Sequence, residues 1–515
     1  MSNSAFEPVN ISPMDEYNQT LVSYVHPPDW VNPEPVDCYD LVVVGGGTAG
    51  LVVAAGAAGL GLGLKVALIE KHLLGGDCLN VGCIPSKCMI RSSRVVAEIL
   101  EAKAYGIHVS NNIEVDFANV MQRMRRIRAE ISPHDSAERF KKLGVDVFLG
   151  KGCFLGGDRV EVGDHILRFK KAVIATGARA TRLSITGMEE AGYLTNETVF
   201  SLTEKPRRMA LIGGGPLDCE LAQAFRRLGS EVVIFDVSDR LLNKEDNDAS
   251  EIIQNVFIKE GIRLILSSQI QRVVKTDQGK VIYFNNKGKE ESITVDQILV
   301  GVGRTPNVEG LNLEAIGVEY DKKQGVFVND YLQTTNPKIY AAGDICMDYK
   351  FTHAADAAAR IVIKNTLFSP FGLGRSKLSD LVMPWTTYTD PEIAHVGMYE
   401  EEARQKGIEV ETIKINLSDV DRAIADGEEL GFVKILHKQN SDQILGATIV
   451  ARHAGEMIGE VTTAIVGKLG LNTLSNVIHA YPTQAEAIKK AADAYRRTLL
   501  TPSSKRLLGL LTKLS

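Results

Sequence analysis

A chain of 515 residues is longer than one hydrophobic core normally supports, so about three domains are expected. Its composition, with 44% hydrophobic residues, 24% charged residues and a net charge of −6, is typical of a soluble globular protein and does not indicate a nucleic-acid partner. Seven cysteines are too few in so long a chain for a disulfide-stabilised scaffold.

The first 37 residues are interpreted as an N-terminal extension. Residues 1–36 are polar and contain prolines, without the basic segment and apolar run of a secretory signal, so we expect a cytoplasmic protein. The stretch His-Pro-Pro-Asp-Trp at 26–30 is too apolar for a simple linker. We expect it to pack on the first domain.

Residues 39–70 predict a strand, a glycine turn, a helix and a second strand that ends in an acid. The uncharged run Leu41–Leu64 has the length of a membrane helix, but eight glycines interrupt it and argue against a transmembrane segment. Glycines allow close approach of the backbone to a pyrophosphate, the helix N-terminus supplies N–H donors, and the acid binds a ribose hydroxyl. The predicted ligands of the first dinucleotide are Gly45, Gly47, Gly50 and Glu70.

The same design recurs at residues 209–236, where Gly213 and Gly215 form the turn and Asp236 ends the second strand. Two such units predict two dinucleotides on one chain. The third glycine position is occupied by Asp218. A carboxylate there suits an empty helix N-terminus, but it would repel a pyrophosphate about 6 Å away by roughly 3 kcal/mol.

A pair of cysteines, Cys78 and Cys83, follows the first unit. Five helical steps span about 7.5 Å, more than the roughly 4.4–6.8 Å between the Cα atoms of a disulfide. A helix here must therefore be distorted, which Gly82 and Pro85 allow. A thiol near a helix N-terminus has a lowered pKa and is reactive. A structural disulfide or a zinc site is the alternative, although structural zinc needs four ligands.

The stretch from Gly75 to Lys87 resembles the redox-active disulfide motif of the class I pyridine nucleotide-disulfide oxidoreductases. This family includes lipoamide dehydrogenase, glutathione reductase and mercuric reductase. The resemblance runs from about Cys38 to Arg497 and is strongest to the mercuric-reductase-like branch, in which Asp77 often occurs.

This resemblance implies an α/β fold with two Rossmann-like dinucleotide-binding domains, the second inserted in the first, and a C-terminal α+β dimerisation domain. The expected parts are an extension (1–37), an FAD-binding domain in two segments (38–180 and 301–378), an NAD(P)-binding domain (181–300), a dimerisation domain (379–500) and a basic amphipathic tail (501–515). It also implies a homodimer with active sites shared between two chains. The tail could contact a membrane surface, and a frayed or docked helix is the alternative.

By the same resemblance, the first unit holds FAD and the second a reduced nicotinamide dinucleotide. Asp236 favours NADH over NADPH, although Arg240 lies close in sequence. Asp344 is expected to bind the ribityl chain of FAD. Further expected cofactor-binding positions are Gly76, Lys87, Gly177, Gly303 and Gly343.

The resemblance assigns Cys83 to the sulfur beside the flavin and Cys78 to the sulfur that meets the substrate. Lys87 matches the lysine near the reactive flavin nitrogen, and Glu220 matches its acidic partner. A positive charge there would stabilise a reduced, anionic flavin. We assign no resident metal site.

The acid–base site departs from the family pattern His-Pro-Thr-x-x-Glu. Tyr481 stands at the histidine position and Glu486 at the glutamate position. A phenol with a pKa near 10 is a poor base beside an imidazole near 6.5. His479, two residues earlier, is a candidate replacement base, and a structural histidine is the alternative. Tyr481 argues against efficient turnover of lipoamide, although mercuric reductases have tyrosine here.

The sequence therefore predicts an FAD-dependent NAD(P)H oxidoreductase that passes electrons through Cys78 and Cys83 to a disulfide, a soft metal ion or a quinone. Mercury(II) reductase is one alternative, although the C-terminal cysteine pair typical of these enzymes is missing. Dihydrolipoyl dehydrogenase is another. A flavin-binding redox sensor with little turnover is the alternative from a different class.

Overall fold

The structure is a computed structural model that describes residues 11–109 and 113–514. Parts of the expected extension (1–10) and tail (515) lie outside the described residues. The chain divides into two compact units. The first unit contains Met1–Gly213, Ala224–Phe235 and Ser268–Leu381, and the second contains Gly214–Gln223, Asp236–Ser267 and Val382–Ser515.

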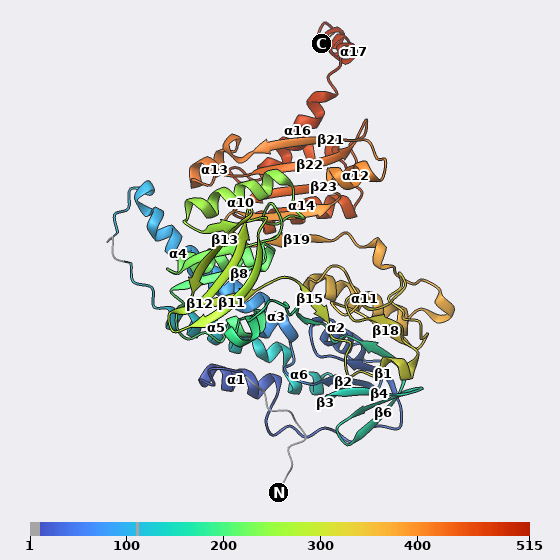
Figure 1. Cartoon of the computed structure of the whole chain (residues 1–515). Coiled ribbons are helices and arrows are strands. Elements are labelled where there is room, and N and C mark those ends of the chain that lie inside the picture. The colour runs from blue at the N-terminus through green and yellow to red at the C-terminus, as the bar shows by residue number, and fades with distance from the viewer. Residues whose placement is uncertain (1–10, 110–112, 515) are drawn as a thin grey trace. The chain divides into compact units, whose positions relative to one another are not determined.

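A largely parallel sheet forms the base of the first unit (Figure 1). Its central strand β1 is buried and apolar from Leu41 to Val44, which is typical of a strand covered on both faces, and it pairs in parallel with β2 and β6. The strand β18 pairs with β6, so the segment after residue 301 returns to the first sheet. The strands of this sheet are β1 (Tyr39–Val44), β2 (Val66–Glu70), β3 (Val145–Leu149), β4 (Gly152–Gly156), β5 (Arg159–Val162), β6 (His165–Ile174) and β18 (Ile339–Ala341).

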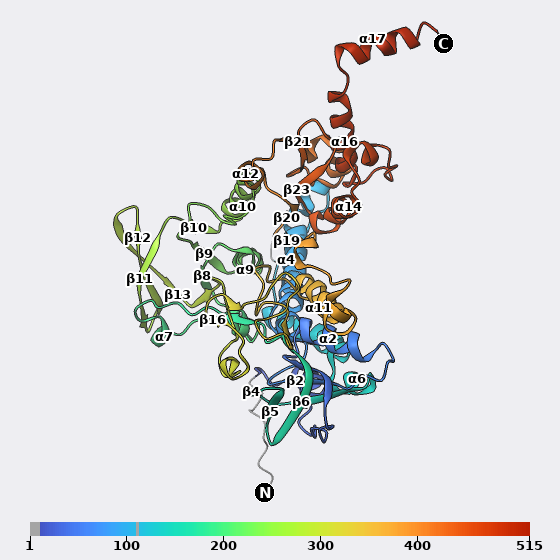
Figure 2. The same ribbon diagram turned by 90° about the vertical axis from the view of Figure 1, so that its right-hand side faces the viewer.

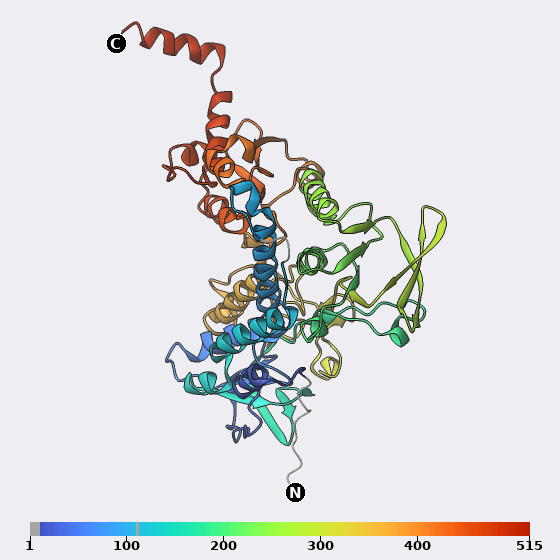
Figure 3. The same cartoon turned by 90° about the vertical axis from the view of Figure 1, so that its left-hand side faces the viewer.

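Helices cover this sheet and carry the cysteine pair. The helix α2 follows β1 through the first glycine turn and packs against α11, and α4 packs along α5 (Figure 3). The helices of the first unit are α1 (Glu16–Val25), α2 (Thr48–Ala58), α3 (Gly76–Asn80), α4 (Cys83–Glu101), α5 (Phe117–Ile131), α6 (Ala137–Lys142), α7 (Met188–Ala191), α8 (Asn196–Val199) and α11 (Thr352–Leu367).

The described part of the N-terminal extension packs on the first sheet, as expected. The indole N–H of Trp30 donates to the carbonyl of Val147 in β3 at 3.1 Å, and the amide of Asn32 donates to the carbonyl of Leu149 at 3.0 Å. Asp15 caps α1 by accepting from the N–H of Asn18. Residues 11–37 are therefore part of the folded first unit and not a linker.

A second Rossmann-like sheet begins at β8 (Arg208–Ile212), which pairs in parallel with β9 (Glu231–Phe235) and with β14 (Gln297–Val300). The helix α9 (Pro216–Arg227) connects β8 and β9. Three antiparallel strands form a separate small sheet (Figure 2), namely β11 (Gln269–Thr276), β12 (Gly279–Asn286) and β13 (Lys289–Val295). The short strands β7 (Ala178–Ala180) and β15 (Arg304–Pro306) pair where the chain leaves and re-enters the first domain. This connection is that of an inserted domain.

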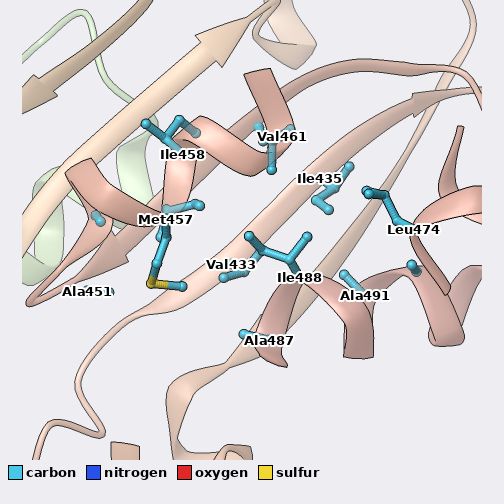
Figure 4. Packing of buried hydrophobic residues seen from close by; sticks show 14 of the residues in the cluster. Val433, Ile435, Ala451, Met457, Ile458, Val461, Leu474, Ala487, Ile488 and Ala491 are labelled. Carbon is cyan, nitrogen blue, oxygen red and sulfur yellow. The ribbon is translucent and has the colours of Figure 1, made fainter. Parts of the chain in front are cut away.

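The C-terminal part of the second unit is a five-stranded antiparallel sheet covered by helices. The strand order is β19, β20, β23, β22, β21, with bounds Pro384–Thr387, Glu392–Gly397, Ile444–Ala451, Phe432–Lys438 and Val410–Asn416. Side chains of α14 and α16 form a core against β22 and β23 (Figure 4), in which Ile435 and Ile488 are fully buried. The helices of this unit are α10 (Asn247–Lys259), α12 (Glu400–Gln405), α13 (Asp421–Asp426), α14 (Ala454–Val466), α15 (Leu471–Ser475), α16 (Glu486–Thr498) and α17 (Pro502–Leu511).

None of the helices in residues 11–109 and 113–514 is both long enough and apolar enough to cross a bilayer. The uncharged run from Leu41 to Leu64 is divided among β1, a glycine turn and α2, as expected.

Candidate active site

The first glycine turn joins β1 to α2 in a conformation that only glycine adopts readily. Gly45 has φ +111°, and its N–H donates to the carbonyl of Ile69 at 2.8 Å. A Cβ at Gly45 would lie 2.3 Å from the carbonyl oxygen of Ala175. The Glu70 carboxylate accepts from the N–H of Gly46 at 2.6 Å, and burial raises the pKa of Glu70. The turn is therefore fixed by the last two residues of β2.

The other glycines expected at this site differ in the space around their Cα atoms. A Cβ at Gly50 would lie 1.8 Å from the carbonyl oxygen of Gly45, and one at Gly76 would lie 2.7 Å from the Cα atom of Gly47. At Gly177, with φ +66°, an added Cβ would meet nothing within 4 Å. Glycine at these positions keeps the turn tight and the N-terminus of α2 free of side chains, the arrangement that a pyrophosphate needs, so these residues fit FAD at this site.

Asp344 follows β18 and is held by an arginine that sequence reasoning missed. The Nε atom of Arg304 lies 3.1 Å from a carboxylate oxygen of Asp344, and the same guanidinium also pairs with Asp77. Burial raises the pKa of Asp344, and the Arg304 charge opposes that rise. Gly343 brings this turn onto α2, because a Cβ there would lie 3.2 Å from the Cβ of Ala49. A weak sequence signal pointed to Arg304, because it directly follows the expected site residue Gly303. In the structure Gly303 has φ +118°.

The cysteine pair lies at a break between two helices. Cys78 is in the short helix α3, Cys83 is the first residue of α4, and Val81 and Gly82 lie between them. A Cβ at Gly82 would lie 2.7 Å from the carbonyl oxygen of Asp77. The expected distortion is therefore confirmed, and glycine is what allows it.

Cys78 and Cys83 are not joined by a disulfide in this structure. A hydrogen bond with Cys83 and burial raise the pKa of Cys78. The expectation of a lowered thiol pKa is therefore wrong for Cys78, because the neighbouring sulfur and the buried setting disfavour its thiolate.

Thr352 is a second residue that sequence reasoning missed. Its hydroxyl oxygen lies 3.3 Å from the sulfur of Cys83, across 269 residues of sequence. Thr352 is the first residue of α11, and its neighbours Phe351 and His353 stack with ring centroids 5.4 Å apart. Nothing in the spacing of the sequence could pair Thr352 with a cysteine, because only the packing of α11 brings it there.

Lys87 lies one helical turn after Cys83, in α4 of the first unit. Glu220 is a buried residue of α9 in the second unit, and its carboxylate accepts from the backbone N–H of Tyr388 at 2.9 Å. The pairing of Lys87 with Glu220 stays a prediction.

The second glycine turn repeats the hydrogen bonds of the first. Gly213 has φ +124° and its N–H donates to the carbonyl of Phe235 at 2.9 Å. The N–H of Gly214 donates to the Asp236 carboxylate at 2.5 Å, as Gly46 does to the acid of the first turn. A Cβ at Gly215 would meet only the Asp218 carboxylate, at 3.6 Å. The turn therefore has the backbone arrangement predicted for a second dinucleotide.

Asp218 differs from the charged residue that we expected. It is fully buried in the first turn of α9, and among the described residues neither of its carboxylate oxygens has a hydrogen-bond partner. Burial raises the pKa of Asp218 well above its ordinary value, and the nearby Asp236 adds to the rise. The repulsion expected between Asp218 and a pyrophosphate requires an ionised carboxylate, which this environment disfavours.

The residues of the expected acid–base site have separate partners. The Nε2 atom of His479 lies 2.8 Å from the Glu460 carboxylate of α14. Tyr481 is 70% exposed, and its hydroxyl donates to Asp421 at 2.9 Å, which raises the pKa of Tyr481. Glu486 begins α16, with one buried carboxylate oxygen that lacks a partner among the described residues. The ion pair of His479 could not be foreseen, because Glu460 lies on another element.

The described residues contain no group of three or more His, Cys, Asp or Glu side chains placed to hold a metal ion.

Two glycine turns with acids and an adjacent cysteine pair define a class of flavoprotein oxidoreductases that bind two dinucleotides. Residues 39–359 match the family model described as pyridine nucleotide-disulphide oxidoreductase, and residues 383–492 match the dimerisation domain of the same family. The chain belongs to the pyridine nucleotide-disulphide oxidoreductase family, whose members depend on FAD and use a pyridine nucleotide.

Its relatives include enzymes with different acceptors. A mercuric reductase of Lysinibacillus sphaericus is 35% identical over 457 residues, covering 88% of this chain and 82% of the relative. A dihydrolipoyl dehydrogenase of Chlamydia muridarum is 33% identical over 465 residues, covering 88% and 96%.

Solved structures of flavoproteins are similar to this chain in fold. LpdA from Mycobacterium tuberculosis has a TM-score of 0.80 at 25% identity, covering 90% of this chain and 100% of LpdA. The HOCl-induced flavoprotein disulfide reductase RclA from Escherichia coli has a TM-score of 0.77 at 25% identity, covering 88% and 99%.

Proposed function

We propose that the protein is a cytoplasmic, homodimeric FAD enzyme that oxidises NADH, and less readily NADPH, and reduces its acceptor through Cys78 and Cys83. The observation that carries this proposal is the hydrogen-bonded thiol pair at the break between α3 and α4. The glycine surface of the first turn supports FAD binding. Asp236, already oriented by Gly214, supports NADH, because a carboxylate repels the extra phosphate of NADPH.

FAD would be held by the first glycine turn with Glu70 and by Asp344, and would supply the two-electron chemistry that links the nicotinamide to the cysteine pair. The oxidised pair is a disulfide between Cys78 and Cys83, and its reduction breaks the S–S bond and gives two thiols after uptake of two protons. Cys78 then attacks the acceptor. The Thr352 hydroxyl, 3.3 Å from the Cys83 sulfur, can donate a hydrogen bond to a thiolate there.

We further propose that, in active sites shared between two chains, the His479 and Glu460 pair of one chain moves the proton of the attacking thiol of the other. A carboxylate 2.8 Å from the imidazole orients the ring, the arrangement that a general base needs. Tyr481, the residue at the expected position of the base, is exposed and donates to Asp421. This assignment allows a small disulfide as acceptor, whereas the mercuric reductase relatives favour a soft metal ion, which thiolates also bind.

The decisive experiment counts reactive thiols in the purified holoenzyme before and after anaerobic addition of NADH or NADPH. We expect two additional thiols per chain after NADH, with a smaller or slower gain after NADPH. The Cys78→Ser and Cys83→Ser variants should show no gain while still oxidising NADH with ferricyanide, which can take electrons directly from a flavin. Cys153→Ser, at a half-buried cysteine of β4, is the matched control and should behave as wild type.

Flavin reduction without a gain in thiols would contradict the role of the cysteine pair and favour a quinone-type acceptor. Reduction by neither nucleotide would contradict the enzyme proposal and favour the redox sensor. If the relay works, steady-state turnover with small disulfides and with mercury(II) identifies the class of acceptor.

A further inference from the structure

The C-terminal helix α17 carries an apolar face that the rest of the described chain leaves uncovered. No residue of Pro502–Leu511 is buried. Exposed leucines recur at positions i, i+3 and i+4 within α17 and at i+7 in the turn that follows it, a spacing that corresponds to one face of a helix. Their exposures are 59% for Leu507, 59% for Leu510, 53% for Leu511 and 84% for Leu514, and Leu508 beside them is 50% exposed.

The opposite side of the same segment is basic. Arg506 and Lys513 are seven residues apart and share that side, with Lys505 next to them. Residues 501–515 contain no acid, so their side chains carry a charge of +3, against −6 for the whole chain and −9 for the remainder. The positive charge and the exposed leucines are therefore concentrated in one short helix on an otherwise acidic protein.

These two features together indicate what covers the leucines. An interfacial helix combines a leucine-rich face with lysines and arginines on the other side and lies in the headgroup region of a bilayer. Anionic lipids attract such cations, whereas the tail of a second copy, with the same +3 charge, is repelled. A helix of ten residues is marginal alone in water, and burial of its apolar face stabilises it.

We propose that α17 docks the enzyme reversibly on the surface of an anionic lipid bilayer. The inserted face is made of Leu507, Leu510, Leu511 and Leu514, and Lys505, Arg506 and Lys513 contact the lipid phosphates. The remainder of the chain is acidic and is repelled by the same surface, so attachment depends on this helix. One short helix gives weak and salt-sensitive attachment, which suits a protein that exchanges between membrane and solution.

The test is flotation of the full-length holoenzyme with two kinds of vesicle, phosphatidylcholine alone and phosphatidylcholine with roughly one third phosphatidylglycerol. We expect binding to the anionic vesicles, with loss as added salt shortens the Debye length from about 10 Å to about 3 Å. Replacing Lys505, Arg506 and Lys513 by glutamine should weaken binding about 100-fold, or about fivefold per cation. Leu507→Gln or Leu511→Gln should weaken it by about tenfold or more.

Three exposed lysines of the first unit provide the matched control. Replacing Lys322, Lys323 and Lys338 by glutamine changes the net charge equally and should weaken vesicle binding far less, because these lysines lie outside the docking segment. Ferricyanide-dependent NADH oxidation, which does not involve the tail, verifies that every variant is folded.

Absence of wild-type binding to anionic vesicles would overturn the proposal. Equal binding by a chain ending at Leu500 would also overturn it, since another surface would then be responsible. Loss of a higher oligomer on truncation, without vesicle binding, would instead show that α17 docks on a second copy.

Discussion

Two equivalent positions of the glycine turns show that the same local fold can surround very different side chains. Gly50 and Asp218 each occupy the third glycine position of a strand, turn and helix unit. A Cβ at Gly50 would meet the carbonyl oxygen of Gly45 at 1.8 Å, whereas the second unit accommodates a whole carboxyl group at Asp218, fully buried. Burial of an acid costs little free energy only when the acid is neutral, or when its charge is paired with a cation or a hydrogen-bond donor.

We therefore predict that Asp218→Gly stabilises the protein, and more so as the pH rises. The unfolded chain loses this proton near pH 4, whereas the native state retains it to higher pH because burial raises the pKa of Asp218. Over that interval the native state binds more protons, so its free energy of unfolding falls with pH, by up to about 1.4 kcal/mol per pH unit. Urea unfolding between about pH 5 and pH 8 measures the difference between variant and wild type.

Asp239→Gly, at an exposed carboxylate of the same unit, is the matched control. A pH-independent effect of Asp218→Gly, or an equal trend in the control, would contradict the assignment. Because burial raises the pKa of Asp218, we also expect the affinity for NADH to fall as the pH rises and this carboxyl group ionises.

His479 allows a second prediction at the scale of a residue. Replacing it by glutamine removes the proposed base but leaves the electron path to the flavin intact. We expect a loss of about 10²-fold in kcat with an aromatic disulfide as acceptor, with ferricyanide turnover unchanged. Glu460→Gln should lose less because it only misorients the ring, and His134→Gln, at an exposed histidine, should lose nothing. Full disulfide turnover by His479→Gln would return the role to Tyr481.

At the scale of an element, the important feature is the interruption between α3 and α4. Cys78 and Cys83 would be too far apart on one regular helix. Val81 and Gly82 break the helix, and Gly82 fits because a Cβ there would approach a backbone oxygen of α3 at 2.7 Å. The spacing of the cysteines is thus compatible with a disulfide only because the helix stops and restarts between them.

We predict that Gly82→Ala lowers the free energy of unfolding by about 1–3 kcal/mol, the usual cost of adding a methyl group where there is no room. It should also slow reoxidation of the dithiol, because the two helices must separate. Gly459→Ala in α14, where an added Cβ meets nothing within 4 Å, should instead stabilise by about 0.5–1 kcal/mol. Thermal unfolding and stopped-flow reoxidation measure these effects. An unchanged stability of Gly82→Ala would contradict this account of the break.

At the scale of the whole molecule, the C-terminal sheet offers the surface expected of a dimer. The end of α14 and the segment before Tyr481 lie together, because His479 contacts Glu460. They expose several large apolar side chains, with Val466 at 63% and Ile478 at 94%. Family dimerisation domains match this part of the chain, so we expect these side chains to be buried between two copies.

Ile478→Asp should therefore weaken the dimer by more than about 100-fold, because it buries an unpaired charge at an apolar contact. Light scattering over a dilution series should give twice the chain mass of 56.1 kDa for wild type and a single chain mass for the variant. Val31→Asp, at an 83% exposed valine in a loop of the first unit, is the matched control. A dimeric Ile478→Asp would place the interface elsewhere.

Much of the site was predictable because its geometry is local. The strands before Gly45 and Gly213, the acids Glu70 and Asp236, and the break near Gly82 each depend on a short run of residues whose backbone preferences are strong. The protonation of Asp218 was not predictable, because its pKa depends on what surrounds the side chain. The expectation of a charged carboxylate at the second turn did not include the burial that raises the pKa of Asp218.

The sequence by itself determined the two glycine turns and the position of the cysteine pair, because glycine φ angles and strand periodicity are encoded within a few neighbouring residues. Only the tertiary structure decided which distant groups meet. It brought Thr352 to Cys83, set Arg304 between Asp77 and Asp344 and paired His479 with Glu460. Such contacts depend on how whole helices and strands pack, and burial then sets which side chains carry charge.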